Sequence, residues 1–260
     1  MKKSVFFGGL FFRPDFLILG MAVVFGLLLV GGLTPFDFKN TPPSEGEFEA
    51  IPVVPAKGDK SLQLKPITFK QCGSTTAVDL VLDRSGSMGS KQDGGTKIKI
   101  EYLKDATKEF VNLMSGESLI GMQSFATTAS IDFKIDKLNT RKDLINSKIS
   151  SLSPSGSTNM AAALTYARDE LKVAIPKFTE YKFSLILLSD GGWNVGGDPT
   201  NVINEIKGLG VTIFTVAFGD KTIVNFMKKS ATAPSDSFYS PGNDELKAIL
   251  KQIAQKICKE

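Results

Sequence analysis

Three short segments of the sequence supply side-chain oxygens that could bind a hard metal ion. Asp83, Ser85 and Ser87 stand two residues apart in DRSGSM, whereas Thr158 lies in SGSTNM and Asp190 in SDGG. Carboxylate and hydroxyl oxygens suit Mg²⁺ and, by the same argument, Mn²⁺ or Ca²⁺. Because the chain contains no histidine, we expect any metal here to be held by oxygen.

Each segment also has a simpler explanation when it is taken alone. The first is typical of an Asp/Ser/Gly turn that begins a loop, and the third of a turn that follows a buried strand. The second is typical of a Ser/Thr/Asn cap at the start of a helix. The predicted positions of the segments in the fold are therefore needed to choose between turns and a ligand set.

Strand and helix patterns alternate along the chain after residue 66. The apolar, β-branched run Ala77–Leu82 predicts a buried central strand, and the runs 119–126 and 131–135 predict a hairpin whose second strand lies antiparallel at the sheet edge. Further strands are predicted at 183–188, at 211–218 and shortly before the last helix. Helical spacing of apolar residues predicts the main helices near 100–113, 140–151, 159–171, 199–208 and 246–257.

Strands separated by helices predict an α/β fold with a doubly wound, mostly parallel, six-stranded sheet, helices on both faces and one antiparallel edge strand. In such a sheet, ligands bind outside the carboxyl ends of the strands, near the point where the strand order reverses. The first and third oxygen-bearing segments follow a strand and the second precedes a helix, so all three are expected at this edge. Their shared position favours a metal site over three unrelated turns.

Together the segments resemble the metal-ion-dependent adhesion site (MIDAS) of the von Willebrand factor type A (VWA) family. That site combines an Asp-x-Ser-x-Ser segment with a later Thr and a later Asp, and the resemblance covers about residues 74–257. It implies that Ser85 and Ser87 bind the metal directly. It also implies that Asp83, Thr158 and Asp190 bind the metal directly or through water.

A site of this kind predicts a protein partner that offers an Asp or Glu carboxylate. Two carboxylates would roughly neutralise a divalent ion, and the partner's acidic group could take a coordination position left to water. Trp193, close after Asp190, is a candidate for the rim of the partner site, with a partly buried packing role as the alternative. Asn159, next to Thr158, is a second candidate for this rim.

The N-terminal part of the sequence predicts export of the domain. Residues 16–33 form an uncharged apolar run of bilayer length, and basic residues precede it, which predicts a cytoplasmic segment 1–15. We expect a single-pass membrane protein with a transmembrane signal-anchor helix; a cleaved signal peptide is the alternative. The proline-rich segment 34–66 predicts a stalk, or a linker without such a role, before an extracytoplasmic VWA-like domain 67–260 at the cell surface or in the periplasm.

The two cysteines of the chain, Cys72 and Cys258, are expected to form a disulfide. One precedes the first predicted strand. The other ends the last predicted helix, which returns from the ligand edge to the edge where that strand begins. Such a bond fits an exported protein, and two unpaired thiols are the alternative.

Composition narrows the possible functions to three classes. The net charge is +4 without a block of like charge, so we expect no nucleic-acid partner. The leading prediction is a membrane-anchored adhesion or assembly module, followed by a structural subunit of an envelope or pilus-like assembly in which the metal site is secondary. A Mg²⁺-dependent hydrolase is disfavoured because the sequence lacks histidine, a reactive cysteine and a phosphate-binding loop. The pattern specifies no oligomeric state.

Overall fold

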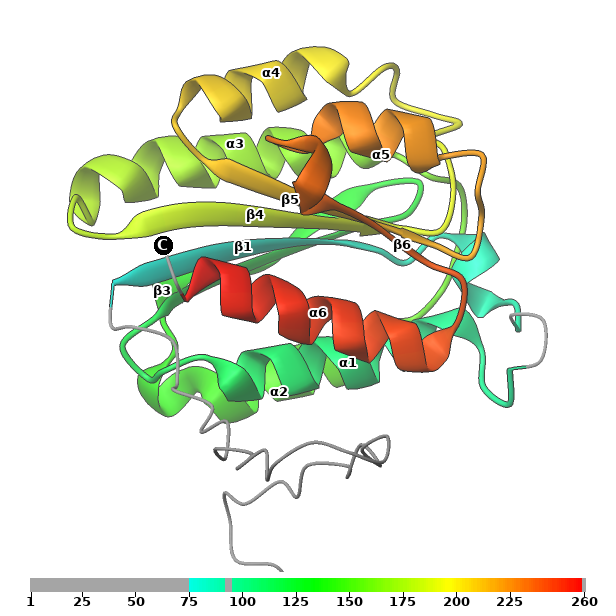
Figure 1. The fold of residues 1–260 in the computed structure, drawn as a ribbon, viewed down its shortest axis with the longest axis horizontal. Coiled ribbons are helices and arrows are strands. Elements are labelled where there is room, and N and C mark those ends of the chain that lie inside the picture. The colour runs from blue at the N-terminus through cyan, green and yellow to red at the C-terminus, as the bar shows by residue number, and fades with distance from the viewer. Residues whose placement is uncertain (1–74, 92–94, 259–260) are drawn as a thin grey trace, which may run out of the picture. The chain divides into compact units, whose positions relative to one another are not determined.

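Six strands form the central sheet of the domain (Figure 1). They are β1 (Thr76–Asp83), β2 (Leu119–Phe125), β3 (Ala129–Lys137), β4 (Lys182–Ser189), β5 (Thr212–Phe218) and β6 (Ser237–Ser240). Their order in space is β3-β2-β1-β4-β5-β6, and every neighbouring pair is parallel except β2 and β3. This topology confirms the predicted mostly parallel sheet with one antiparallel edge strand.

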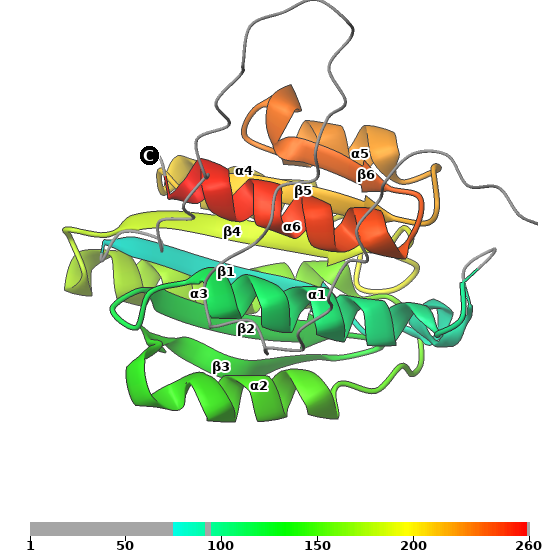
Figure 2. The same cartoon turned by 60° about the horizontal axis from the view of Figure 1, so that its bottom comes forward.

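Helices cover both faces of this sheet. In the described part of the chain the α-helices are α1 (Lys99–Leu113), α2 (Lys142–Ser151), α3 (Met160–Lys177), α4 (Thr200–Gly208), α5 (Val224–Ser230) and α6 (Asn243–Ile257). Apolar residues of α1, α2 and α6 pack on one face, and those of α3, α4 and α5 pack on the other, as Figures 1 and 2 show. The result is the doubly wound α/β architecture that the sequence predicts.

β1 lies at the centre of the sheet and is buried on both sides. Leu80 and Leu82 face the core beneath α1 and α6, whereas Val81 faces the opposite core. Burial on both faces explains the nearly continuous apolar sequence of this strand. After β3 the chain returns to β4, next to β1, so the strand order reverses at this pair. The carboxyl ends of β1 and β4 therefore meet where sheets of this kind bind ligands.

The computed structural model describes residues 75–91 and 95–258, all within the unit Ile67–Glu260. The predicted cytoplasmic segment, transmembrane helix and stalk, residues 1–66, lie outside the described residues. Within the described ranges, no helix has both the length and the apolar character needed to span a bilayer. The membrane anchor therefore stays a prediction.

Cys258 directly follows α6 and is half-buried against the core. The end of α6 lies at the same edge of the sheet as the start of β1 (Figures 1 and 2). This is the position that the disulfide prediction requires of Cys258. Cys72 lies outside the described residues, so its pairing with Cys258 stays a prediction.

Asp79 places a carboxyl group in the otherwise apolar middle of β1. Its side chain is buried opposite Gly121 of β2, where an added Cβ would collide with the Asp79 carboxylate and with Ile135. Gln123 lies near, but neither its amide nor the Asp79 carboxyl meets a partner in hydrogen-bond geometry. Burial raises the pKa of Asp79 well above its ordinary value; Gln123 offsets part of this rise, and Glu170 adds to it.

We predict that Asp79→Asn changes how stability depends on pH. Folded Asp79 keeps its proton to higher pH than the unfolded side chain, so its contribution to stability is full below about pH 4 and is lost as pH rises. Asp79→Asn should be more stable than the wild type by about 1 kcal/mol or more at pH 8, and the two should converge near pH 4. Urea unfolding of the full chain at both pH values measures the difference. Parallel pH profiles for the two proteins would contradict the assignment.

Candidate metal centre

Asp83 is the last residue of β1, and it is fully buried. Its Oδ1 accepts a hydrogen bond from the backbone N–H of Ser85 at 2.7 Å, and its Oδ2 accepts one from the Ser189 hydroxyl at 2.5 Å. Burial raises the pKa of Asp83 to about 6; the bonds from Ser189 and Ser85 limit this rise, and the charge of Asp190 adds to it. Among the described side chains, no lysine or arginine forms an ion pair with Asp83.

Ser85, Ser87 and Asp190 form a connected cluster of hydroxyl and carboxylate groups beside Asp83. The hydroxyl oxygens of the two serines are 3.0 Å apart, and Ser87 Oγ donates to Asp190 Oδ1 at 2.6 Å. Asp190 directly follows β4 and is buried, whereas Ser87 is exposed, so the cluster reaches the protein surface. The fold thus brings together the predicted ligands of the first and third segments.

Lys99 joins this cluster, although the sequence analysis did not predict it. It is the first residue of α1, and its Nζ lies 2.8 Å from Asp190 Oδ2. The helix dipole disfavours a cation in the first helical turn, and the carboxylate of Asp190 offsets this cost. A lysine at a helix start was the available sequence signal, but it did not identify the acidic partner 91 residues away.

Thr158 lies in the loop before α3 and is held by the loop that follows β4. Its backbone N–H donates to Asn194 Oδ1 at 2.8 Å. Its carbonyl oxygen accepts from the backbone N–H groups of Asn194 and Val195 at 3.1 and 3.4 Å. Thr158 is buried in this position. Asn194, which the sequence analysis missed, therefore fixes a predicted ligand residue relative to the end of β4.

Two backbone hydrogen bonds join the loop of Thr158 to the first segment. Gly86 N–H donates to Gly156 O, and Ser155 N–H donates to Arg84 O, both at 2.9 Å. A Cβ on Gly86 would lie 3.0 Å from Gly156 O, so a larger residue would push the two segments apart. Gly86 is thus needed for this close approach. All three predicted ligand segments share the carboxyl edge of the sheet.

The two candidate rim residues both have structural contacts. Trp193 is half-buried, and its ring lies 4.7 Å from that of Phe226, centroid to centroid, at a tilt of 57°. Asn159 caps α3 by accepting a hydrogen bond from Ala162 N–H, and its amide donates to Thr127 O. Packing therefore explains much of the position of Trp193, and capping explains that of Asn159.

The donor set fits a hard divalent cation. Two carboxylates and three hydroxyls are oxygen ligands of the kind that Mg²⁺ prefers. Within residues 75–91 and 95–258, no group of three or more His, Cys, Asp or Glu side chains could hold a metal by itself. A cation at this edge would therefore need the serine and threonine hydroxyls. We call the set Asp83, Ser85, Ser87, Thr158 and Asp190 the candidate metal centre.

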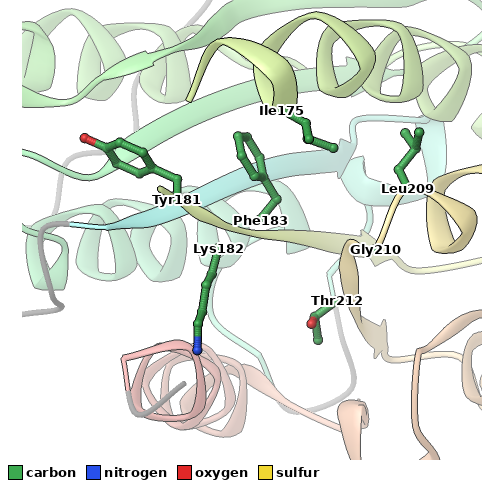
Figure 3. A pocket seen from close by; sticks show the side chains of 7 residues that line it. All are labelled: Ile175, Tyr181, Lys182, Phe183, Leu209, Gly210 and Thr212. Atoms are coloured by element: carbon green, nitrogen blue, oxygen red, sulfur yellow. The ribbon is translucent and has the colours of Figure 1, made fainter. Parts of the chain in front are cut away.

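A cavity of about 290 Å³ lies at the opposite edge of the sheet (Figure 3). Lys182 and Thr212, which begin β4 and β5, contribute to its lining. The other lining residues are Ile175, Tyr181, Phe183, Leu209 and Gly210. The cavity contains no residue of the candidate metal centre, so it is a separate feature.

Fold and site together define a doubly wound α/β domain with hydroxyl and carboxylate groups at its switch point. The family model of the von Willebrand factor type A domain matches residues 78–255. The chain belongs to this family, which confirms the family predicted from the sequence.

Similar proteins include one from human and two solved structures. Vitrin from Homo sapiens is 25% identical over 194 residues, which cover 74% of this chain and 27% of vitrin, so this chain spans about a quarter of that relative. Proximal thread matrix protein 1 (PTMP1) from the mussel byssus, with a zinc-occupied MIDAS motif, has a TM-score of 0.63 at 22% identity, covering 72% of this chain and 49% of that one. The vWF domain of the type V pili tip protein Mfa5 from Porphyromonas gingivalis has a TM-score of 0.57 at 17% identity, covering 70% and 94%.

We predict that Gly156→Ala is markedly destabilising. Gly156 has φ +63°, and an added Cβ would also collide with the hydroxyl of Thr127. Gly197 is a matched control because its φ is +84° but no atom lies within 4 Å of an added Cβ. Gly197→Ala should cost about 1–2 kcal/mol through backbone conformation alone, and Gly156→Ala roughly 2–4 kcal/mol. Urea unfolding measures both, and equal losses would show that the close approach at Gly156 is unimportant.

Proposed function

We propose that this chain presents a VWA domain that binds one divalent cation and, through it, an acidic group of a protein partner in adhesion or assembly. The main supporting observation is Asp83, a fully buried carboxyl group with no ion pair among the described side chains, beside the second buried carboxyl group of Asp190. Buried carboxylates are costly unless a positive charge and hydrogen bonds compensate them. A divalent cation would supply the missing charge.

Each residue of the candidate metal centre has a role in this proposal. Ser85 and Ser87 would bind the cation directly through their hydroxyls. Asp83, Thr158 and Asp190 would bind it directly or through water. Mg²⁺ is the expected cation, with Mn²⁺ and Ca²⁺ as alternatives. The zinc-occupied MIDAS motif of PTMP1 supports a divalent cation at a site of this type.

A partner's Asp or Glu would take a coordination position otherwise held by water. Ser87 is exposed, so the partner could approach from its side of the cluster. Trp193 and Asn159 would border this approach while keeping their packing and capping contacts. The chain lacks histidine, which is the commonest general base, and we therefore propose a binding role rather than an enzymatic one.

The cellular setting is also part of the proposal. Residues 16–33 would anchor the chain in a membrane with its N-terminus in the cytoplasm, and residues 34–66 would hold the domain outside. A disulfide between Cys72 and Cys258 would link the segment before β1 to the residue after α6. The relation to a matrix protein and to a pilus tip protein supports an adhesion or assembly role.

A structural subunit in a cell-envelope or pilus-like assembly is the second candidate function. The observation that favours it is the state of Asp190, since Ser87 bonds to one carboxylate oxygen and Lys99 to the other. This side chain is thus satisfied by the protein alone. In this alternative the domain packs permanently with its neighbours, and its assembly is insensitive to metal.

We predict saturable binding of Mg²⁺ and Mn²⁺ to one site of the purified full chain, measured by isothermal calorimetry. Asp83→Asn preserves the shape of the side chain but removes its charge, and Ser85→Ala with Ser87→Ala removes both hydroxyls. Each variant should lower the affinity at least about tenfold. Ser90→Ala is the control, because Ser90 lies in the same turn and, among the described residues, its hydroxyl donates to the carbonyl oxygen of Ser87 and to no side chain of the candidate metal centre. Wild-type protein that binds neither ion would make the structural subunit the leading function.

We further predict that cation affinity falls in mild acid. A proton and the cation compete for Asp83, whose pKa is about 6, so affinity at pH 5 should be about tenfold weaker than at pH 7.5. Ser189→Ala removes a hydrogen bond that lowers this pKa, and the loss should then begin at higher pH. Calorimetry across this pH range tests both statements. An affinity independent of pH would show that Asp83 is not a ligand.

A further inference from the structure

The ammonium group of Lys99 makes a largely buried ion pair with Asp190 of the candidate metal centre. Its Nζ lies 2.8 Å from Asp190 Oδ2, and the side chains of Lys99 and Asp190 are 15% and 0% exposed. Oδ1 of the same carboxylate accepts from Ser87, so both oxygens of Asp190 already have partners. Solvent and salt screen such a pair much less than a surface pair.

Lys97, two residues earlier, forms an exposed ion pair with which the pair of Lys99 can be compared. It bonds to Asp105 at 2.9 Å, but the two side chains are 53% and 36% exposed. Exposed pairs of this kind contribute little to stability. Lys99, by contrast, places its charge at a helix start, where the helix dipole opposes it, and directs it to a buried predicted ligand.

Lys99 has a second acidic residue nearby, Asp220, in the loop after β5. The charge of Lys99 contributes to the lowered pKa of Asp220, after the hydrogen bonds from Thr222. The Asp220 carboxylate is occupied by the backbone N–H and the hydroxyl of Thr222. The hydrogen-bonded ion pair of Lys99 is therefore with Asp190.

We propose that Lys99 is a tethered competitor of the divalent cation for Asp190, and that it thereby sets the cation affinity of this domain. This inference rests on the proposed function and extends it. With Lys99 in place, the two aspartates and the lysine leave one net negative charge to face a divalent cation. The ammonium weakens binding by repelling the cation, and it leaves more positive charge on a bound cation for an acidic partner to neutralise.

The test compares variants of the full chain that differ in charge at this position. Lys99→Gln removes the charge but keeps a side-chain donor for Asp190, and Lys99→Met removes both charge and donor. Lys99→Arg keeps the charge. Lys97→Met is the matched control, since it changes the net charge of the chain equally at an exposed pair. Circular dichroism establishes whether each variant is folded. If Lys99→Met does not fold, Lys99→Gln alone tests the removal of the charge.

Calorimetric titration with Mg²⁺ and Mn²⁺ gives the affinities. We expect Lys99→Gln and Lys99→Met to bind on the order of tenfold more tightly than the wild type at low ionic strength. Lys99→Arg and Lys97→Met should stay within about twofold of the wild type. Thermal melting gives a second readout, because Mn²⁺ should raise the melting temperature of Lys99→Gln more than that of the wild type.

The outcomes separate this inference from the proposed function. Wild-type binding with unchanged affinity in Lys99→Gln would overturn the role of Lys99 and leave the cation-binding function standing. Binding in Lys99→Gln without binding in the wild type would support the competition and overturn the cation-binding function of the natural chain. An absence of binding in every variant would overturn both. An equal gain of cation affinity in Lys97→Met would show that the net charge of the chain causes the effect, and it would overturn the inference.

Discussion

Burial of two aspartates at the carboxyl edge of the sheet is the constraint on which the rest of the site depends. An ionised carboxylate away from water needs hydrogen-bond donors and positive charge, or it takes up a proton. Asp83 has two hydrogen-bond donors but no ion pair among the described residues, and its pKa rises to about 6. Asp190 has a serine hydroxyl and a lysine ammonium. These donors come from separate segments, so the carboxylates determine how those segments meet.

The parallel sheet makes this meeting possible. β1 and β4 are neighbours although about a hundred residues separate them along the chain, and their shared direction places the ends of both strands at one edge. Residues after each strand can then turn toward each other while the middle of the sheet stays mostly apolar, with Asp79 and Gln123 as buried exceptions. Gly86 and Gly156 allow the second segment, which contains Thr158, to approach within hydrogen-bond distance of the first. The polar centre is thus confined to the boundary of the core.

Sequence patterns predicted the sheet well because burial on two faces leaves a clear signal. The apolar runs predicted the strands, and their alternation with helices predicted the α/β fold class. The antiparallel strand extends over Ala129–Lys137, beyond the predicted 131–135, because its end residues are partly buried or exposed and lack an apolar pattern. The candidate ligand segments were predicted from the spacing of Asp83, Ser85 and Ser87, which is local in sequence.

Contacts between distant segments were not predictable in the same way. Lys99, Ser189 and Asn194 act on residues of the candidate metal centre from other elements, and nothing in their local sequence names those partners. Trp193 illustrates the reverse case, since its place near Asp190 suggested an interface, but its ring packs on Phe226. Residue type and spacing predict which polar groups a segment offers, whereas the tertiary fold decides which groups they bond to.

The two aspartates differ in a way that matters for binding. Asp190 forms an ion pair with Lys99, whose positive charge is part of the chain. Asp83 is stabilised by hydrogen bonds alone. A diffusible cation at this edge would therefore gain most from Asp83 and would share Asp190 with Lys99. Sharing leaves the cation less neutralised than two free carboxylates would, and charge left on a cation near the surface attracts an acidic group from outside. The internal ion pair thus connects the packing of α1 against the sheet to the chemistry of the partner that such a site would select.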